Sequence, residues 1–393
     1  MTPEEELTLA LCGRAAYREA ESESIVKLAE RSDLRAFTDV LTRQRLLPLV
    51  GSRLVELAPM TTSGEFAESV SSATRQNQYL AILHEAVTLA MLRALAEAGI
   101  SAIPLKGALL GEAIYGDPGL RFAMDIDLLV HPDDLNAAVD VMRSQGYGRS
   151  HDLPWEDGLP LLHHALPPER PNLPQLELHW RIHWNESRFS QAMLARSSET
   201  DGRGRVPQPA DELAALLLFY ARDSFFGLKL AADIGAWWDA RGHELAPVAL
   251  DPIVAAHPEL RGSIGAALLV AERLVGLPAG RLLSAQWEPN RRARAAASLA
   301  NWTATGEPAK QVANMMAVDW LLTPRGRRRS FARRYMFQPS PVLAATYGRS
   351  PDRRVRNELW RIVHGTSRAA KFGYRYCGIR YSIRGGRKWS VPA

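Results

Sequence analysis

Two aspartates, Asp125 and Asp127, stand in the otherwise apolar segment AMDIDLLV at residues 123–130. Alternating polar and apolar residues favour a β-strand, and residues two apart on a strand point to the same face of its sheet. The two carboxylates are therefore predicted to project together from an apolar setting. Because two neighbouring negative charges are costly to bury, this pair requires a cation beside it.

A candidate phosphate site precedes the two aspartates. The apolar run ISAIPL (100–105) fits a buried strand, and Lys106-Gly107 then opens a predicted helix over 107–116. Glycine permits close backbone approach, and the first turn of a helix offers free N–H groups at the positive end of its dipole. A carboxylate pair facing such an anion site is the arrangement that Mg²⁺-assisted phosphoryl or nucleotidyl transfer requires.

Hydrophobic periodicity and charge divide the chain into four regions. These are a helical region over 1–98, a mixed region over 99–200, a second helical region over 201–323, and a basic tail with interspersed aromatic residues over 324–393. The mixed region reads strand, helix, strand, helix, strand, strand, with the last two strands at 159–167 and 175–184. That order indicates an α/β or α+β domain between helical regions.

Charge is distributed unevenly along the chain. The net charge is +5, yet residues 321–393 hold 18 lysines and arginines against two acidic residues, and the other 320 residues hold 30 basic and 41 acidic residues. A basic tail on an acidic body favours an anionic partner, such as nucleic acid, nucleotide phosphates or a membrane surface. The alternative is a solvated, basic face of a helical tail.

Cysteine content and the N-terminus bear on the compartment. Cys12 and Cys377 are the two cysteines, too few for a disulfide framework or a cysteine-based zinc site. The first residues are acidic rather than basic, and no run approaches the roughly 18 consecutive apolar residues of a membrane span. We therefore expect a cytoplasmic protein without a transmembrane segment.

Several other chemistries lack their motifs in this sequence. There is no Walker A motif, no Gly-x-Ser-x-Gly nucleophile elbow and no Gly-x-Gly-x-x-Gly fingerprint. His163, His164 and His183 invite a zinc interpretation, but the helical His-Glu-x-x-His pattern is missing, so zinc is disfavoured.

A long segment of the chain, covering about residues 100–184, resembles the bacterial uncharacterised nucleotidyltransferase family of the DNA polymerase β-like superfamily. The features that carry the resemblance are Lys106-Gly107, Tyr115, Arg121, Asp125-Ile126-Asp127, Gly146-Tyr147 and Glu177-Leu178-His179-Trp180. The resemblance implies an α+β chain with a central mixed-sheet nucleotidyltransferase fold. It also implies transfer of a nucleoside monophosphate from a nucleoside triphosphate to a hydroxyl of a peptide, sugar or nucleic acid acceptor.

The resemblance assigns roles to individual residues. Asp125 and Asp127 would hold two Mg²⁺ ions, and Glu177 would be the third carboxylate, either holding the metal that activates the acceptor hydroxyl or taking its proton. Lys106, Gly107 and Arg121 would bind the triphosphate, with Arg121 as a bidentate clamp. His179 and Tyr115 are candidates for substrate contact.

One departure from the superfamily pattern affects the predicted binding of the nucleoside triphosphate donor. Ala108 stands where the superfamily has a serine that helps hold the triphosphate, and Lys106 would have to substitute for it. The alternatives are a non-catalytic nucleotide- or RNA-binding protein on the same fold, and a kinase-like phosphotransferase.

Several of these residues have structural alternatives. Lys106 and Glu177 could be solvated strand residues, His179 a structural histidine, and Tyr115 a packing residue. Arg121 could pair with Asp117, and Asp233 could touch the acceptor or pair with Arg222.

Overall fold

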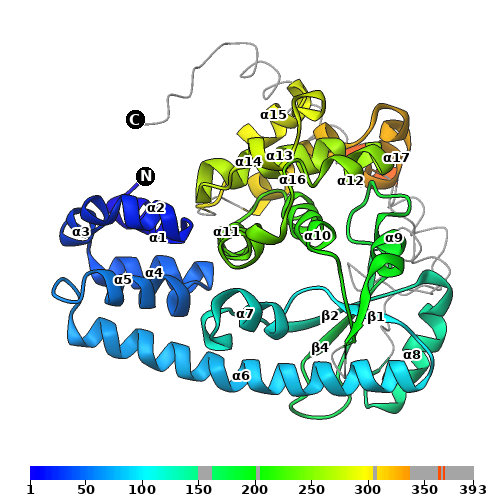
Figure 1. Cartoon of the computed structure of the whole chain (residues 1–393), viewed down its shortest axis with the longest axis horizontal. Helices are drawn as coiled ribbons and strands as arrows, with labels where there is room; N and C mark the ends of the chain where they lie inside the picture. The colour runs from blue at the N-terminus through cyan, green and yellow to red at the C-terminus, as the bar shows by residue number, and fades with distance from the viewer. Residues whose placement is uncertain (149–161, 201–203, 304–307, 337–361, 364–365, 368–393) are drawn as a thin grey trace.

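The structure is a computed structural model of the 393-residue chain, and it describes residues 1–148, 162–200, 204–303, 308–336, 362–363 and 366–367. It is rich in helix and contains one small mixed sheet, which agrees with the predicted α+β class. Figure 1 shows the sheet with one long helix beneath it and a large body of helices above it.

The N-terminal region is helical, as its periodicity predicts. Its shorter helices are α1 (Pro3–Cys12), α2 (Ala15–Ala20), α3 (Ser22–Glu30), α4 (Leu34–Gln44) and α5 (Ser52–Leu57). The long helix α6 (Gly64–Glu97) follows. It begins where the Ser63 hydroxyl accepts a hydrogen bond from the Phe66 N–H at 3.2 Å, which satisfies one free donor of the first turn. It ends before Gly99, whose φ of +74° favours glycine.

By length and composition, α6 is the one helix of the described residues that could cross a membrane. One third (33%) of its most apolar 18-residue window is buried inside the protein. Phe66 and Val70 at its start belong to the large helical core, and Met91, Leu92 and Leu95 near its end pack under the sheet. The two ends of α6 therefore have partners within this fold, whereas Tyr79, Leu80, Ile82 and Leu83 in its middle are exposed.

Four short strands form the central sheet in the order β1-β2-β4-β3. They are β1 (Ala102–Pro104), β2 (Asp125–Val130), β3 (His163–Leu166) and β4 (Gln175–His179). β2 pairs antiparallel with β1 and parallel with β4, and β3 pairs antiparallel with β4. The helices between the strands are α7 (Ala108–Tyr115) and α8 (Leu135–Ser144), so the predicted order of elements in this region is observed.

The two faces of the sheet have different partners. Ile126 and Leu128 of β2 and Leu178 of β4 point to one face, where they pack against α6 and α8. Asp125 and Asp127 alternate with these residues and point to the opposite face, under the large helical body. Helices from the C-terminal half of the chain therefore cover the charged face of the sheet.

One predicted strand is shorter in the structure. The segment 175–184 was expected to be extended throughout, but β4 ends at His179. The buried carboxylate of Glu186 accepts hydrogen bonds from the backbone N–H groups of Ile182 and His183, at 3.0 and 3.1 Å. Because these donors are held by a side chain rather than a neighbouring strand, the chain turns there.

The remaining elements complete the helical body. After α9 (Phe189–Arg196) comes an unpredicted small hairpin of β5 (Ser198–Thr200) and β6 (Gly204–Val206). The helices that follow are α10 (Pro209–Arg222), α11 (Lys229–Arg241), α12 (Asp251–Ala256), α13 (Arg261–Val275), α14 (Ala279–Leu282), α15 (Arg291–Ser298), α16 (Pro308–Leu322) and α17 (Arg328–Met336).

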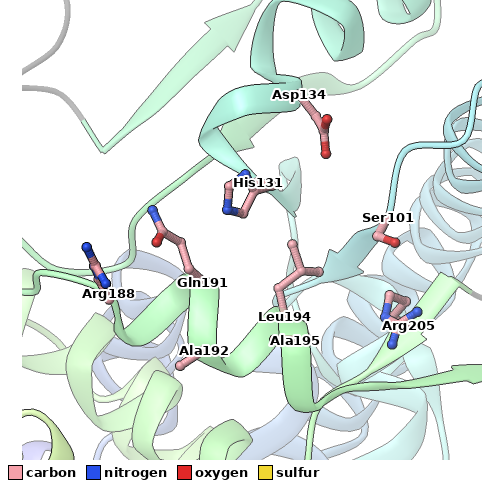
Figure 2. A pocket seen from close by; sticks show the side chains of 9 residues that line it. All are labelled: Ser101, His131, Asp134, Arg188, Gln191, Ala192, Leu194, Ala195 and Arg205. Carbon is pink, nitrogen blue, oxygen red and sulfur yellow. The ribbon is translucent and has the colours of Figure 1, made fainter.

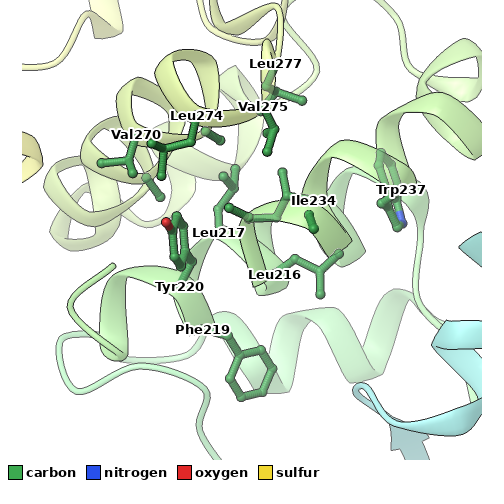
Figure 3. Close-up of a cluster of buried hydrophobic side chains, with 14 of the residues drawn as sticks. Leu216, Leu217, Phe219, Tyr220, Ile234, Trp237, Val270, Leu274, Val275 and Leu277 are labelled. Carbon is green, nitrogen blue, oxygen red and sulfur yellow. The ribbon is translucent and has the colours of Figure 1, made fainter. Parts of the chain in front are cut away.

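The N-terminal and C-terminal helices share one hydrophobic core. Its centre lies between α10, α11 and α13, where residues such as Leu217, Tyr220 and Trp237 are fully buried (Figure 3). Leu7 and Leu11 of α1 belong to the same cluster. These two helical regions therefore form a single body that sits over one face of the sheet.

The basic tail lies mostly outside the described residues. Its first part packs against the helical body: the Arg327 side chain donates to the Asn185 carbonyl, and the Arg328 guanidinium lies 5.8 Å from the centroid of the Trp320 ring. Beyond Met336 the structure describes only residues 362–363 and 366–367 of the tail, so the expectation of an anionic partner falls mainly outside the described residues.

Candidate active site

The charged face of the sheet brings three carboxylates together. Asp125 and Asp127 lie two apart on β2, and Glu177 on β4 is the direct neighbour of Asp127 in the parallel register. One carboxylate oxygen from each residue lies within 4.8 Å of the others. Asp125 and Glu177 are partly exposed, whereas the Asp127 side chain is buried, so this site opens toward Asp125 and Glu177.

Asp127 is held by two partners on opposite sides. The Lys106 ammonium lies 3.1 Å from Oδ2, and Nε2 of His179 lies 2.9 Å from Oδ1. Burial would raise the pKa of Asp127, but the charge of Lys106 and the hydrogen bond from His179 outweigh burial and hold that pKa below its ordinary value. Asp127 is thus a buried carboxylate that stays ionised.

Lys106 and Gly107 connect β1 to α7 at the edge of this cluster. The Lys106 ammonium is also 3.9 Å from Asp125 Oδ2 and 5.3 Å from the centroid of the Phe219 ring. Burial alone would lower the pKa of Lys106. The charges of Asp127 and Asp125 raise it by more than burial lowers it, so the pKa lies above its usual value and the ammonium stays charged. Gly107 has φ of +99°, a conformation that side chains disfavour, and it directly precedes the first turn of α7.

His179 and His163 add imidazoles to the same face. His179 is fully buried, and its Nε2 is 3.3 Å from Glu177 Oε2 as well as 2.9 Å from Asp127 Oδ1. His163, its partner across β3 and β4, places Nε2 3.5 Å from the same Glu177 oxygen. Burial, with a smaller contribution from His179, lowers the pKa of His163 to about 4. His163 was one of the three histidines considered as zinc ligands, and it lies in this cluster. His179, which was not among those three, lies there too.

Arg121, for which a triphosphate contact was predicted, lies in a buried network of ion pairs and hydrogen bonds. Only 2% of its side chain is exposed, and its guanidinium donates to Asp233 Oδ2 through Nε at 3.1 Å and lies 2.9 Å from that oxygen through Nη2. Nη1 donates to the Gly107 carbonyl at 3.0 Å. These contacts connect the guanidinium to the Lys106-Gly107 turn on one side and to α11 on the other, so Arg121 positions that turn.

Tyr115 and Asp233 belong to the same buried network. The Tyr115 hydroxyl donates to Asp233 Oδ1 at 3.0 Å, and burial followed by the Asp233 charge raises the pKa of Tyr115 well above its usual value. Asp233 lies on α11 and pairs with Arg121 rather than with Arg222, its predicted partner. Tyr115, a predicted substrate contact, is buried in this network, which attaches α7 to the helical body.

Two basic residues near the site, Lys229 and Arg222, were not predicted from the sequence to belong to it. Lys229 begins α11, and burial, with the nearby charge of Arg121, lowers the pKa of its ammonium to about 7; Asp233, Lys106 and Asp125 also act on it. Arg222 ends α10 and lies 4.6 Å from the centroid of the Phe219 ring, the ring that Lys106 also contacts. Each is an ordinary basic residue at a helix end about 100 residues from the aspartates, so no local pattern marks it.

A separate cavity of about 570 Å³ lies at the other end of β2 (Figure 2). It is lined by Ser101, His131, Asp134, Arg188, Gln191, Ala192, Leu194, Ala195 and Arg205. Arg205 is already engaged by Ser197 and Glu199. None of its lining residues belongs to the carboxylate cluster, so this cavity is not the site described above.

The buried pair of Arg121 and Asp233 generates a prediction about stability. Replacing Arg121 by Met leaves a buried carboxylate without its cation, and we expect the free energy of unfolding to fall by about 3–5 kcal/mol. Denaturant unfolding measures this loss, and Arg143→Met, which breaks the exposed pair with Asp140, should cost less than about 1 kcal/mol. An Arg121→Met protein of normal stability that loses nucleotide affinity would instead favour a direct phosphate contact.

Comparison with known proteins agrees with this geometry at the level of the family. Residues 30–276 match the model of a family described as uncharacterised nucleotidyltransferase, and this match spans more than half of the chain. No curated protein and no solved structure matches the chain. The family implies a nucleoside triphosphate as substrate. The chain therefore belongs to the uncharacterised nucleotidyltransferase family.

Proposed function

We propose that the protein transfers a nucleoside monophosphate from a nucleoside triphosphate to a hydroxyl group of an acceptor and releases pyrophosphate. The observation that carries this proposal is the meeting of Asp125, Asp127 and Glu177 on one sheet face, beside the lysine that precedes a helix start. Residues 99–200 would form the catalytic domain on a nucleotidyltransferase fold. The helical region over 201–323 would cover the carboxylate face of the sheet.

The donor set fits Mg²⁺, the ion that such chemistry implies. Mg²⁺ prefers oxygen ligands and is held by one or two carboxylates together with substrate phosphates. The three carboxylates offer only oxygen atoms, and two of the three are partly exposed. When bound, two Mg²⁺ ions would neutralise phosphate charge and stabilise the attacking and leaving oxygens.

The residues of the chain would bind and orient the reactants. The acceptor oxygen bonds to the α-phosphorus, the bond from that phosphorus to the bridging oxygen breaks, and pyrophosphate leaves with the electron pair. Glu177 would take the hydroxyl proton. Burial raises the pKa of Glu177, but contacts with His179 and His163 outweigh burial and keep it below its usual value, so the carboxylate is ionised, as a proton acceptor must be.

The positive charges around the cleft would hold the triphosphate. Lys106 now lies against Asp127, and the same ammonium could turn to the phosphates once another cation neutralises the carboxylates. The free N–H groups of the first turn of α7 lie next to it. Lys229 and Arg222 approach from the helical body. This arrangement compensates for Ala108, which offers no hydroxyl to the triphosphate.

Asp125 provides the cleanest test of the reaction, because its side chain is partly exposed and Asp127 keeps both of its own partners. Purified protein is incubated with Mg²⁺, a fractionated cell extract as the source of acceptor, and ATP labelled at either the α- or the γ-phosphate. We expect α-label, and not γ-label, to enter one fraction. Asp125→Asn should reduce this incorporation at least about 100-fold, since one carboxylate cannot replace the pair.

Asp140→Asn is the matched control, because Asp140 is an exposed aspartate on α8 whose ion pair among the described residues is with Arg143 on the same helix. It should label the extract like the wild type. Incorporation of γ-label would identify a phosphotransferase, and incorporation of neither label would favour a nucleotide-binding protein. Wild-type transfer by Asp125→Asn would remove that residue from the site.

The low pKa of Lys229 predicts a pH-dependent affinity for nucleotide. A lysine with a pKa of about 7 is charged below pH 7 and loses its charge as pH rises through 7, so its attraction for phosphate fades over that range. We expect the Kd for ATP with Mg²⁺, measured by calorimetry, to be several-fold higher at pH 8.5 than at pH 6. The Lys229→Met variant should lose most of this dependence. An equal pH dependence in the two proteins would show that Lys229 does not contact the phosphates.

A further inference from the structure

The imidazoles of His163 and His179 and the carboxylates of Asp127 and Glu177 form a second cluster beside the all-oxygen one. His163 and His179 face each other in the β3–β4 register, with ring centroids 4.7 Å apart. The cluster therefore has two ring nitrogens and the Glu177 carboxylate close together on one side of the sheet, with Asp127 next to His179.

The spacing of the His163, His179 and Glu177 atoms matches the ligand shell of a metal ion, and Asp127 is hydrogen-bonded to one of the two rings. Nε2 of His179 is 2.9 Å from Asp127 Oδ1 and 3.3 Å from Glu177 Oε2, and Nε2 of His163 is 3.5 Å from the same Glu177 oxygen. Neighbouring ligands of an octahedral ion with bonds of about 2.1 Å are separated by about 3 Å. The three ligand atoms of His163, Glu177 and His179 all lie within 4.8 Å of one another.

The hydrogen bonding of the two rings leaves this side open to a metal. Nδ1 of each ring is buried and has no hydrogen-bond partner among the described residues. No described partner on Nδ1 therefore fixes the tautomer of either ring, and a metal ion could take the place of a proton on Nε2. His179 cannot satisfy both carboxylates with the single proton that Nε2 can carry, whereas one cation can be shared by both.

We propose that, within this cluster, His163, His179 and Glu177 bind a first-row transition-metal ion of the Mn²⁺ or Zn²⁺ class. Imidazole ligands suit such ions, whereas Mg²⁺ prefers oxygen ligands, so the two clusters would select different metals. Asp127 and Glu177 belong to both clusters. The two oxygens of Asp127 have different neighbours: Oδ2 contacts Lys106, and Oδ1 contacts His179. Asp127 therefore lies at the boundary between the all-oxygen cluster and the imidazole cluster.

The test uses Mn²⁺ alone, with the full-length protein and no nucleotide. Electron paramagnetic resonance measures the affinity for Mn²⁺, and pulsed measurements detect couplings to imidazole ¹⁴N. We expect the wild type to show these couplings and to retain Mn²⁺ in a tenfold excess of Mg²⁺. His163→Gln should bind Mn²⁺ at least about tenfold more weakly. His163→Asp, which supplies oxygen in place of nitrogen, should recover affinity while the ¹⁴N coupling falls.

His131→Gln is the control, because His131 lies at the far end of β2 and belongs to neither cluster. It should bind Mn²⁺ like the wild type. A wild type without ¹⁴N coupling, or His163 variants with unchanged affinity and coupling, would overturn the proposal and leave the rings as a hydrogen-bonded network. The fold of each variant is monitored by its thermal unfolding, and two His163 variants are used so that loss of one does not remove the test.

This site can fail or stand independently of the proposed transfer reaction. Nitrogen-coupled Mn²⁺ in a protein that labels no acceptor would overturn the reaction and keep the metal site. Label transfer by a protein that shows no nitrogen-coupled Mn²⁺ would overturn the metal site and keep the reaction.

Discussion

The buried carboxylate of Asp127 is the charge around which the rest of the site is arranged. A carboxylate with no exposed surface is tolerated only if it is paired and hydrogen-bonded, and Lys106 and His179 supply those contacts. Lys106 follows β1 and His179 ends β4, the two strands on either side of β2. The order of the strands is thus what allows Asp127 to stay ionised, and the same order brings Glu177 beside it.

The two faces of the sheet divide the requirements of stability and chemistry. One face buries apolar residues against α6 and α8, and the other carries the carboxylates and imidazoles. Because that second face carries carboxylates, the elements that cover it must also supply positive charge. The helical body provides both, because Phe219 packs near Lys106 and His179 while Arg222 and Lys229 lie at adjoining helix ends. Arg121 and Asp233 fix the body to the Lys106-Gly107 turn.

Local pattern was enough to predict the strand of Asp125 and Asp127, the helix after Gly107 and the α+β class, because alternation and glycine stops act over a few residues. It could not distinguish a cleft-facing arginine from a buried one, since Arg121 owes its position to Asp233, 112 residues away. Lys229 and the meeting of His163 with His179 were missed for the same reason. Strand register and helix docking decide these contacts, and neither has a short-range signal. The end of β4 at His179 depends likewise on Glu186, a buried side chain seven residues further on.

The central claim is that nucleotide and metal meet on the carboxylate face of the sheet. A crystal structure of the protein with Mn²⁺ and a non-hydrolysable ATP analogue tests it most directly. The account predicts a cation about 2.0–2.3 Å from oxygens of Asp125 and Asp127, with the triphosphate between Lys106 and Lys229. An analogue whose phosphates bind instead in the cavity at Arg188 and Arg205, with no cation at the carboxylates, would contradict it.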